Sequence, residues 1–278
     1  MSLTLSARHR QLLRQAATRH GRRKSDCFLC EGLRGCREAL RYRPDWLEVA
    51  VFSASLAASG QADEMRRRIP PDRLAIVPDE DFAGLAVTEA PQGALLLLRR
   101  RPPSPGAAAP RDPLALVLDR IGDPGNLGTI LRTAWAIGLH RVWLTTGTAD
   151  PFSPKAIRAG MGAQFALEFE PAGSLAEARE RLAKAGYARL WLSSPRDGVS
   201  CYDAAFRLDG AALVIGGEAE GVGELPGAPR VTIPMPGGAE SLNAAQAATL
   251  LLFEAVRRGV LGTPVPAPPP EPAPRPRV

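Results

Sequence analysis

Residues 114–145 read LALVLDRIGDPGNLGTILRTAWAIGLHRVWLT. An apolar run at Leu114–Leu118 precedes a loop of glycine and small polar residues, a helix-forming stretch at Leu127–Ile137 and a second apolar run at Val142–Thr145. Strands that are buried on both faces and separated by crossover helices are typical of parallel sheets. The stretch therefore predicts an α/β fold with a mostly parallel sheet.

The same alternation continues over residues 114–262, which we expect to form one domain. Further strands are predicted at Phe165–Phe169, Leu190–Leu192, Ala212–Ile215 and Val231–Ile233, with helices at Leu175–Ala185 and Ala244–Val256. Residues 1–101 predict a second, smaller α/β domain. Its helices are expected at residues 6–19, Leu33–Leu40 and Gln61–Arg68, and its strands at Cys27–Cys30, Trp46–Phe52, Leu74–Val77 and Ala94–Leu98.

Two proline-rich stretches flank the domain predicted for residues 114–262. Five prolines fall in Arg101–Pro113, so we interpret residues 102–113 as an extended linker. Half of the residues in Thr263–Val278 are proline, and a disordered tail is expected at residues 263–278.

Composition places the chain among globular proteins, because 45% of its 278 residues are hydrophobic and 23% are charged. No apolar run approaches the roughly 18 residues of a membrane span, and the N-terminus lacks an apolar signal core. Four cysteines do not make a disulfide framework in a chain of this length. We expect a cytoplasmic protein that does not contact membranes.

The net charge of +6 lies entirely in residues 1–101. Residues 1–101 carry 18 Lys and Arg against 12 Asp and Glu, whereas the remainder carries 17 of each. A GC-rich genome would explain why 32 of the 35 basic residues are Arg, but not this asymmetry. A basic arm suits nucleic acid. The candidate RNA-binding residues are Arg8, Arg10, Arg14, Arg22, Arg23 and Lys24.

Three loops rich in glycine and small polar residues follow predicted strands, where ligands bind in open parallel sheets. They lie in residues 119–138, 216–227 and 233–255, the last of which runs into an Ala- and Leu-rich helix. Neither a dinucleotide-binding GxGxxG after the first strand nor a Walker A motif is present. Taken singly, these glycines are also compatible with ordinary turns, and Asn126 with a helix N-cap.

Taken together, the three loops resemble a known family. The runs NLGTILRTAWAIG, GGEAEG and IPMPGGAESLN are similar to the three motifs of the SpoU (TrmH-type) family of SPOUT RNA methyltransferases, over roughly residues 112–258. The stretches FLCEGLRGCREAL and APQGALLL resemble the ribosomal-protein-like RNA-binding domain that usually precedes them. The resemblance implies methyl transfer from S-adenosylmethionine to a ribose 2′-hydroxyl of tRNA or rRNA, a trefoil knot, and a homodimer with active sites near its interface.

The resemblance also implies site residues. The catalytic candidates are Arg132, Asn126, Glu218, Ser241 and Asn243, and the cofactor-binding candidates are Gly216, Ile233, Leu242, Met235 and Ile215. Many members read GxEGxG in the second motif, whereas here Ala219 and Glu220 precede Gly221.

These residue types suit the chemistry. A sulfonium methyl is already activated, so the enzyme must align a hydroxyl opposite the departing sulfur and help it lose its proton, which needs no metal. Arg132 either acts as the base, which requires a strongly depressed pKa, or clamps a phosphate while Asn126 orients the hydroxyl. Glu218 either fixes the loop or contacts the substrate.

Other signals point to structure. Cys27, Cys30 and Cys36 form C-x2-C-x5-C without a fourth ligand at zinc-like spacing, so core thiols and no metal are expected. The rival functions are a non-catalytic RNA-binding protein on the same scaffold, and an rRNA methyltransferase that confers antibiotic resistance. A pure binding module has no reason to keep the polar residues of a methyl-transfer site.

Overall fold

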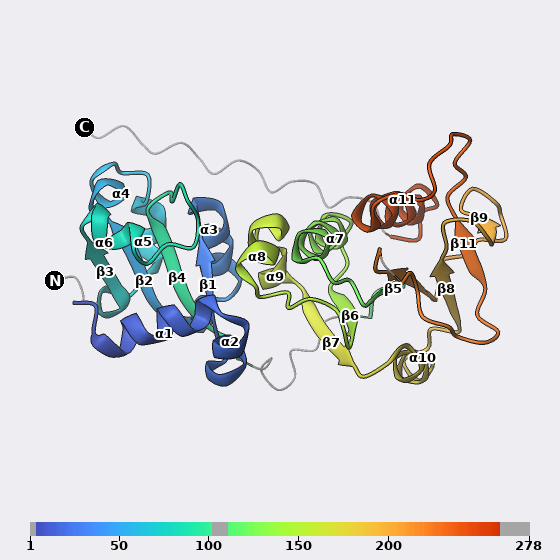
Figure 1. Cartoon of the computed structure of the whole chain (residues 1–278), viewed down its shortest axis with the longest axis horizontal. Helices are drawn as coiled ribbons and strands as arrows, with labels where there is room; N and C mark the ends of the chain where they lie inside the picture. The colour runs from blue at the N-terminus through green and yellow to red at the C-terminus, as the bar shows by residue number, and fades with distance from the viewer. Residues whose placement is uncertain (1–3, 102–110, 219, 262–278) are drawn as a thin grey trace.

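The computed structural model describes residues 4–101, 111–218 and 220–261. The chain contains two β-sheets, which lie side by side (Figure 1). We call residues 4–101 the N-terminal unit and residues 111–261 the C-terminal unit. The predicted tail at 263–278 and most of the predicted linker lie outside the described residues. Within the described part of the chain, no helix has the length and apolar character needed to cross a membrane.

The N-terminal unit has a four-stranded mixed sheet. Its order is β1 (Cys27–Glu31), β4 (Ala94–Arg99), β2 (Leu47–Ser53) and β3 (Leu74–Val77). Strand β4 is antiparallel to both neighbours, and β2 and β3 are parallel. The accompanying helices are α1 (Ala7–Ala17), α2 (Arg19–Ser25), α3 (Leu33–Tyr42), α4 (Ala54–Ala58), α5 (Asp63–Arg68) and α6 (Asp79–Ala83). The four strands predicted from the sequence are all present.

The C-terminal unit has a seven-stranded sheet in which every strand pair is parallel. Its order is β7 (Glu168–Ala172), β6 (Arg141–Thr145), β5 (Leu114–Asp119), β10 (Ala211–Gly216), β8 (Arg189–Ser193), β11 (Arg230–Thr232) and β9 (Val199–Ser200). The helices are α7 (Pro124–Ala136), α8 (Pro154–Gly160), α9 (Ala163–Ala166), α10 (Leu175–Lys184) and α11 (Ala244–Arg257). The expected α/β class with a mostly parallel sheet is confirmed.

Alternate residues of β5 serve two cores. Leu114, Leu116 and Leu118 pack against α7 and α11, whereas Ala115 and Val117 pack against α10. Successive side chains of a strand point to opposite faces of the sheet, so a central strand covered on both faces must be apolar throughout. All six residues of β5 are accordingly buried.

One predicted strand was wrong. Residues 165–169 were expected to be extended, but Ala163–Ala166 form α9 and β7 begins only at Glu168. Gly162, in the left-handed conformation at φ +99°, allows the chain to turn into α9. Phe165 is fully buried there, and a short apolar run does not distinguish a buried helix from a strand. Helix α8 and the two-residue strand β9 were not predicted at all.

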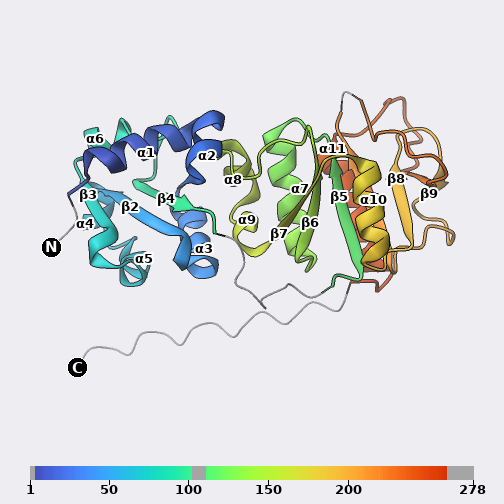
Figure 2. The ribbon, with the colours of Figure 1, turned by 90° about the horizontal axis from the view of Figure 1, so that it is seen from below.

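The two units share one hydrophobic cluster. Phe28 of β1 packs on Phe152, with ring centroids 4.7 Å apart, and on Phe165. Arg22 of α2 donates from Nε to Asp150 Oδ2 at 2.7 Å and from Nη1 to the carbonyls of Ala16 and Ala17. The two units are therefore packed against each other, and α1 and α2 lie along the same edge as the carboxyl ends of the C-terminal strands (Figure 2).

Glu254 holds the end of α11 in place. Its side chain is only 6% exposed and accepts hydrogen bonds from Arg257 and Arg258, which hold its pKa at about 2. Arg258 in turn donates to the carbonyls of Cys201, Asp203 and Phe206. This ion-pair network ties the turn after β9 to α11.

We expect Glu254→Gln to lower the free energy of unfolding at pH 7 by about 1–3 kcal/mol, because charge-assisted hydrogen bonds are lost. The folded pKa lies below the ordinary value of 4.5. The stabilisation is therefore present above pH 4.5 and is lost as the pH falls toward 2. Urea unfolding at pH 7 and pH 3.5 should show the deficit shrinking at the lower pH. The exposed pair of Glu177 with Arg181 provides the control, since Glu177→Gln should cost at most about 0.5 kcal/mol.

Candidate active site

Three loops meet at the carboxyl edge of the sheet through one cluster of polar side chains. Asn126 lies in the first turn of α7, Glu218 follows β10, and Asn243 caps α11. Asn126 donates from Nδ2 to Glu218 Oε1 at 2.9 Å, and Asn243 donates from Nδ2 to Glu218 Oε1 at 2.5 Å and to Asn126 Oδ1 at 3.0 Å. Each of the three side chains thus contacts the other two.

Asn243 and Asp123 start the two helices that carry this cluster. Asn243 Oδ1 accepts from the amides of Ala245 and Gln246, and Asp123 Oδ1 accepts from the amide of Asn126. Lys155 donates to Asp123 Oδ2 at 2.6 Å, which together with the Asn126 amide lowers the pKa of that carboxyl. Because Asp123 and Asn243 fix where α7 and α11 begin, the positions of Asn126 and Asn243 are set by helix capping.

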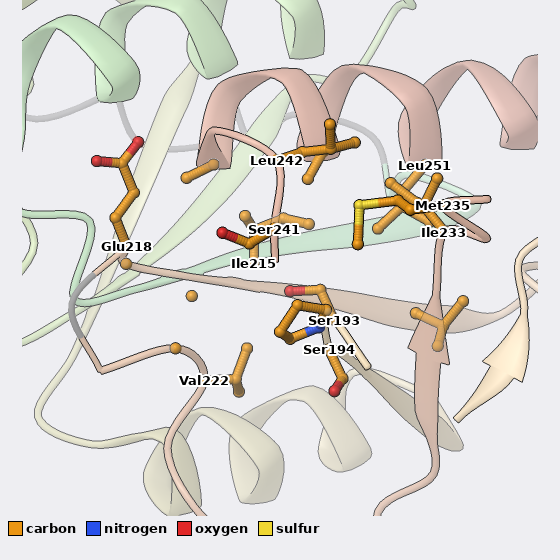
Figure 3. Close-up of a pocket in the computed structure, with 17 residues that line it drawn as sticks. Ser193, Ser194, Ile215, Glu218, Val222, Ile233, Met235, Ser241, Leu242 and Leu251 are labelled. Carbon is orange, nitrogen blue, oxygen red and sulfur yellow. The ribbon is translucent and has the colours of Figure 1, made fainter. Parts of the chain in front are cut away.

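A pocket lies between these loops and the sheet, and we call it the cofactor pocket (Figure 3). Its cavity volume is about 120 Å³. Figure 3 shows Glu218 at one end and Met235 at the other, with Ser241 and Leu242 above Ile215 between them. The remaining walls come from Ser193, Ser194, Pro195, Gly216, Gly217, Gly221, Val222, Val231, Ile233, Ala244, Ala247 and Leu251.

The backbone of this pocket suits an adenine nucleoside. Among the described residues, the amides and carbonyls of residues 233–242 take part in no backbone–backbone hydrogen bond, so those beside Ile233 and Leu242 are free to pair with a ligand. Gly216 allows the second loop to pass close by, because a Cβ there would lie 2.3 Å from the Gly221 carbonyl carbon and the Val222 nitrogen. Apolar walls with unpaired backbone groups fit the adenosine part of S-adenosylmethionine.

Comparison with known proteins places this arrangement in a family. The model of the SpoU rRNA methylase family matches residues 113–253. The chain belongs to this family.

Individual relatives agree. A 23S rRNA (guanosine(2553)-2′-O)-methyltransferase of Bacillus subtilis is 30% identical and aligns over 85% of this chain and 91% of its own. The mitochondrial rRNA methyltransferase 3 of Homo sapiens is 35% identical, but the chain spans only 47% of its length. The crystal structure of a SpoU methyltransferase of Streptomyces viridochromogenes in complex with AdoMet has a TM-score of 0.76 at 27% identity, covering 93% of this chain and all of that chain. The family expected from the three motifs is confirmed.

Most of the site residues that the SpoU motifs implied line this pocket or lie at its end. All five cofactor-binding candidates line it, namely Gly216, Ile233, Leu242, Met235 and Ile215, and so does Ser241. Asn126, Glu218 and Asn243 form the polar cluster at its end. Ala219, where the second motif departs from the usual pattern, lies outside the described residues.

Arg132 stands apart from the cluster. It follows Asn126 by six residues on α7, which is about 9 Å along the helix axis, and its side chain is exposed. Thr133, next to it, contacts Thr249 of α11 at 3.2 Å. Within the chain, the structure therefore does not bring Arg132 to Glu218 and Asn243.

Arg120 is a site residue that the sequence analysis missed. It has a left-handed conformation at φ +55° and reaches over the second loop to Glu220 and to the carbonyl of Gly221. The neighbouring carboxylate of Asp119 accepts from the amide of Gly223 at 2.8 Å and from Thr145 Oγ1 at 2.7 Å. These contacts hold the loop that walls the cofactor pocket. No local pattern in the sequence marks Arg120.

The candidate RNA-binding residues differ in how far they are exposed and in their partners. Arg8, Arg14, Arg23 and Lys24 are exposed, and Arg10 lies 3.7 Å from Asp81. Arg22 is the exception among the candidate RNA-binding residues, because it is buried and occupied by Asp150 and two carbonyls. The structure gives Arg22 an internal role in place of the expected RNA contact.

The cysteines lie in the core. Cys27, Cys30 and Cys36 are buried free thiols, and Cys36 Sγ donates to the carbonyl of Cys30 at 3.3 Å. Burial raises the pKa of Cys36 well above its ordinary value. In the described ranges, no group of three or more His, Cys, Asp or Glu side chains has the geometry of a metal site.

Two substitutions of Asn243 separate helix capping from contact with Glu218. Serine and aspartate are both good N-caps, so Asn243→Ser and Asn243→Asp should both preserve the start of α11. Aspartate places a second carboxylate where the amide nitrogen now lies 2.5 Å from Glu218. At pH 7 we expect Asn243→Asp to be less stable than Asn243→Ser by about 1 kcal/mol, from the repulsion of like charges.

Urea unfolding checks this prediction at low and high salt. The difference in stability between the two variants should narrow at about 1 M salt, because salt screens the repulsion between the two exposed carboxylates. Equal stability of the variants at pH 7 would mean that Asn243 acts on the structure through its cap alone.

Proposed function

We propose that the protein methylates a ribose 2′-hydroxyl of rRNA with S-adenosylmethionine held in the cofactor pocket. The observation that carries this proposal is a second cavity, which we call the substrate recess. Arg120, Asp123, Asn126 and Gly147 line it, and it shares Gly217, Glu218, Gly221 and Ala244 with the cofactor pocket. A ligand in one cavity thus meets a ligand in the other at Glu218.

S-adenosylmethionine, when bound, supplies an activated methyl group, and the protein has to deliver the hydroxyl in line with it. The amide of Asn126 lies at the recess and is oriented by Glu218 and Asn243, so it is suited to hold the ribose oxygen. Glu218 accepts two amide hydrogen bonds, which favours its role as the orienting group of the cluster. Its carboxylate thereby acts on the hydroxyl through the two asparagines.

The missing component of the site is Arg132, and a second copy of the chain supplies it. Leu250 and Phe253 of α11 are 47% and 50% exposed, although large apolar side chains are usually buried. Helix α11 packs beside α7, on which Arg132 is exposed. A homodimer that covers these two helices buries Leu250 and Phe253 and brings Arg132 of one protomer to its partner's site.

The N-terminal unit, residues 1–101, provides the RNA-binding domain in this proposal, and residues 114–262 provide the methyltransferase domain. Five exposed basic residues near the start of the N-terminal unit support RNA binding, namely Arg8, Arg14, Arg19, Arg23 and Lys24. The trefoil knot also belongs to the proposal. It is supported by the position of the segment 233–242, which returns from β11 to α11 past the loop 216–222 and lines the same pocket.

Cofactor binding is expected to survive a chelator and to depend on Gly216. Gly216→Ala should weaken S-adenosylmethionine binding at least tenfold, since its Cβ would displace the backbone at Gly221 and Val222. Gly237→Ala, which adds a methyl group into open space on the neighbouring loop, should stay within twofold of the unmodified protein. Calorimetry in EDTA measures the affinity of the unmodified protein and of both variants for S-adenosylmethionine. A strict metal requirement, or equal affinities for the two variants, would contradict the assigned pocket.

Arg132→Ala should lower the rate of methyl transfer to rRNA by about 10²-fold or more, as expected for a group that acts in the transition state. Affinity for the cofactor should stay unchanged, because Arg132 lies outside the cofactor pocket. Lysine should restore only part of the rate, because a point charge does not replace a planar fork. Single-turnover methylation and calorimetry separate the two effects.

A mixed dimer tests where Arg132 acts. Arg132→Ala and Glu218→Gln should each be inactive alone. If Arg132 acts in its partner's site, a dimer with one subunit of each variant contains one intact site and regains activity. No recovery in verified mixed dimers would place Arg132 in its own subunit's site or remove it from the mechanism.

A further inference from the structure

A cleft between the two units lies apart from the cofactor pocket and the substrate recess. One wall is α2 with the start of β1 and the residue after β4. The other is formed by the C-terminal ends of β6 and β7 and by the loop that follows β6. We call it the interdomain cleft. It measures about 380 Å³, and its polar lining includes Arg19, Arg23, Arg100, Thr146 and Asp150.

The cleft carries uncompensated positive charge. Its two carboxylates are already paired, Asp150 with Arg22 at 2.7 Å and Asp26 with Arg100 at 3.6 Å. Within the described residues, no salt bridge involves Arg19 or Arg23, and both side chains are exposed. Two free guanidinium groups in a concave site are suited to bind phosphate.

The cleft continues from the substrate recess along one loop. Gly147 lines the recess, whereas Thr146 and Thr148 on either side of it line the cleft. The recess lies over the ends of β5 and β10, and the cleft over the ends of β6 and β7. With neighbouring strands about 4.8 Å apart, β10 and β7 are separated by about 14 Å. A few nucleotides of single-stranded RNA are long enough to span this distance.

We propose that the interdomain cleft binds the sugar–phosphate backbone of the RNA segment next to the target nucleotide, with Arg19 and Arg23 on its phosphates. This inference rests on the proposed function of the substrate recess. The exposed side chain of Thr146 adds a hydroxyl that can reach a phosphate or ribose oxygen. Because Phe28 and Phe152 at the base of the cleft are buried against each other, they are not free to stack on bases.

In this proposal, the N-terminal unit helps to position the RNA relative to the substrate recess. Arg22 holds Asp150, and with it the loop after β6, against α2, so that the recess and the cleft keep a fixed spacing. RNA that fills both cavities is anchored on either side of Gly147. Arg19 and Arg23 thereby select targets whose flanking strand is unpaired and able to enter the cleft.

The test compares two double variants of the full-length protein. Arg19→Ala/Arg23→Ala removes the free charges of the cleft. Arg66→Ala/Arg67→Ala removes two exposed charges from α5, which lies along the opposite edge of the N-terminal unit (Figure 2). Both variants lose the same net charge, so long-range electrostatics are matched. A truncated C-terminal unit is unsuitable, because it would expose Phe152 and Phe165.

Binding of a 12-nucleotide poly(U) strand is measured by fluorescence anisotropy over a range of salt concentrations. Each phosphate contact on single-stranded RNA contributes about 0.7 to the slope of log K against log salt. The cleft variant should therefore have a slope about 1.4 smaller than that of the unmodified protein. The α5 variant should keep the original slope. Equal slopes for the two variants would overturn the inference.

Methylation of rRNA from a strain that lacks the gene provides the second readout. The cleft variant should lose tenfold or more in kcat/KM and retain its affinity for S-adenosylmethionine, whereas the α5 variant should lose neither. If the unmodified protein methylates this rRNA and the cleft variant does so equally well, the cleft inference fails and the proposed function stands. If the unmodified protein methylates no rRNA or tRNA, the proposed function fails, whatever the salt slopes show.

Discussion

The hydrogen bonds among Asn126, Glu218 and Asn243 are the interaction on which the site depends. Asn243 uses its carbonyl oxygen to cap α11 and its amide to reach Glu218 and Asn126, so a single side chain sets both the helix start and the shape of the site. Asp123 does the corresponding work for α7. The ends of β5, β10 and β11 are thereby joined into one edge. The proposed methyl transfer depends on such an edge, because the protein contributes mainly by aligning the hydroxyl with the methyl group.

Close backbone approach is the second constraint. The loop after β10 passes so near its neighbours that Gly216 and Gly217 have no room for a side chain. A Cβ added at Gly217 would lie 2.3 Å from the carbonyl oxygen of Arg120. Arg120 donates to the carbonyl of Gly221, and Asp119 accepts from the amide of Gly223, so these two side chains hold the later part of the loop in place. A polar loop held in this way presents backbone groups to a ligand without collapsing into the pocket.

Packing between the units fixes the N-terminal unit, for which we propose RNA binding, beside this edge of the sheet. The cluster around Phe28 and Phe152 sets the N-terminal unit against the C-terminal one, and Arg22 adds an ion pair that is largely withdrawn from water. The charges of the basic arm consequently have different roles. Arg22 maintains the structure, whereas Arg19 and Arg23 face a cleft that continues into the substrate recess.

The sequence by itself determined the class of the sheet and most of its strands, because burial on both faces produces local apolar runs. The residues around the cofactor pocket were implied by the resemblance of its three motifs to a known family. The sequence did not determine α9, where a buried apolar run serves a helix as well as a strand. Only the tertiary structure brought Asn126 into contact with Asn243, which is 117 positions away in the sequence. It also paired the buried Arg22 with Asp150 and placed Arg120 in contact with the loop after β10. The partner of a polar side chain depends on which strand ends lie side by side, and the order of strands in a sheet is not written in any one segment.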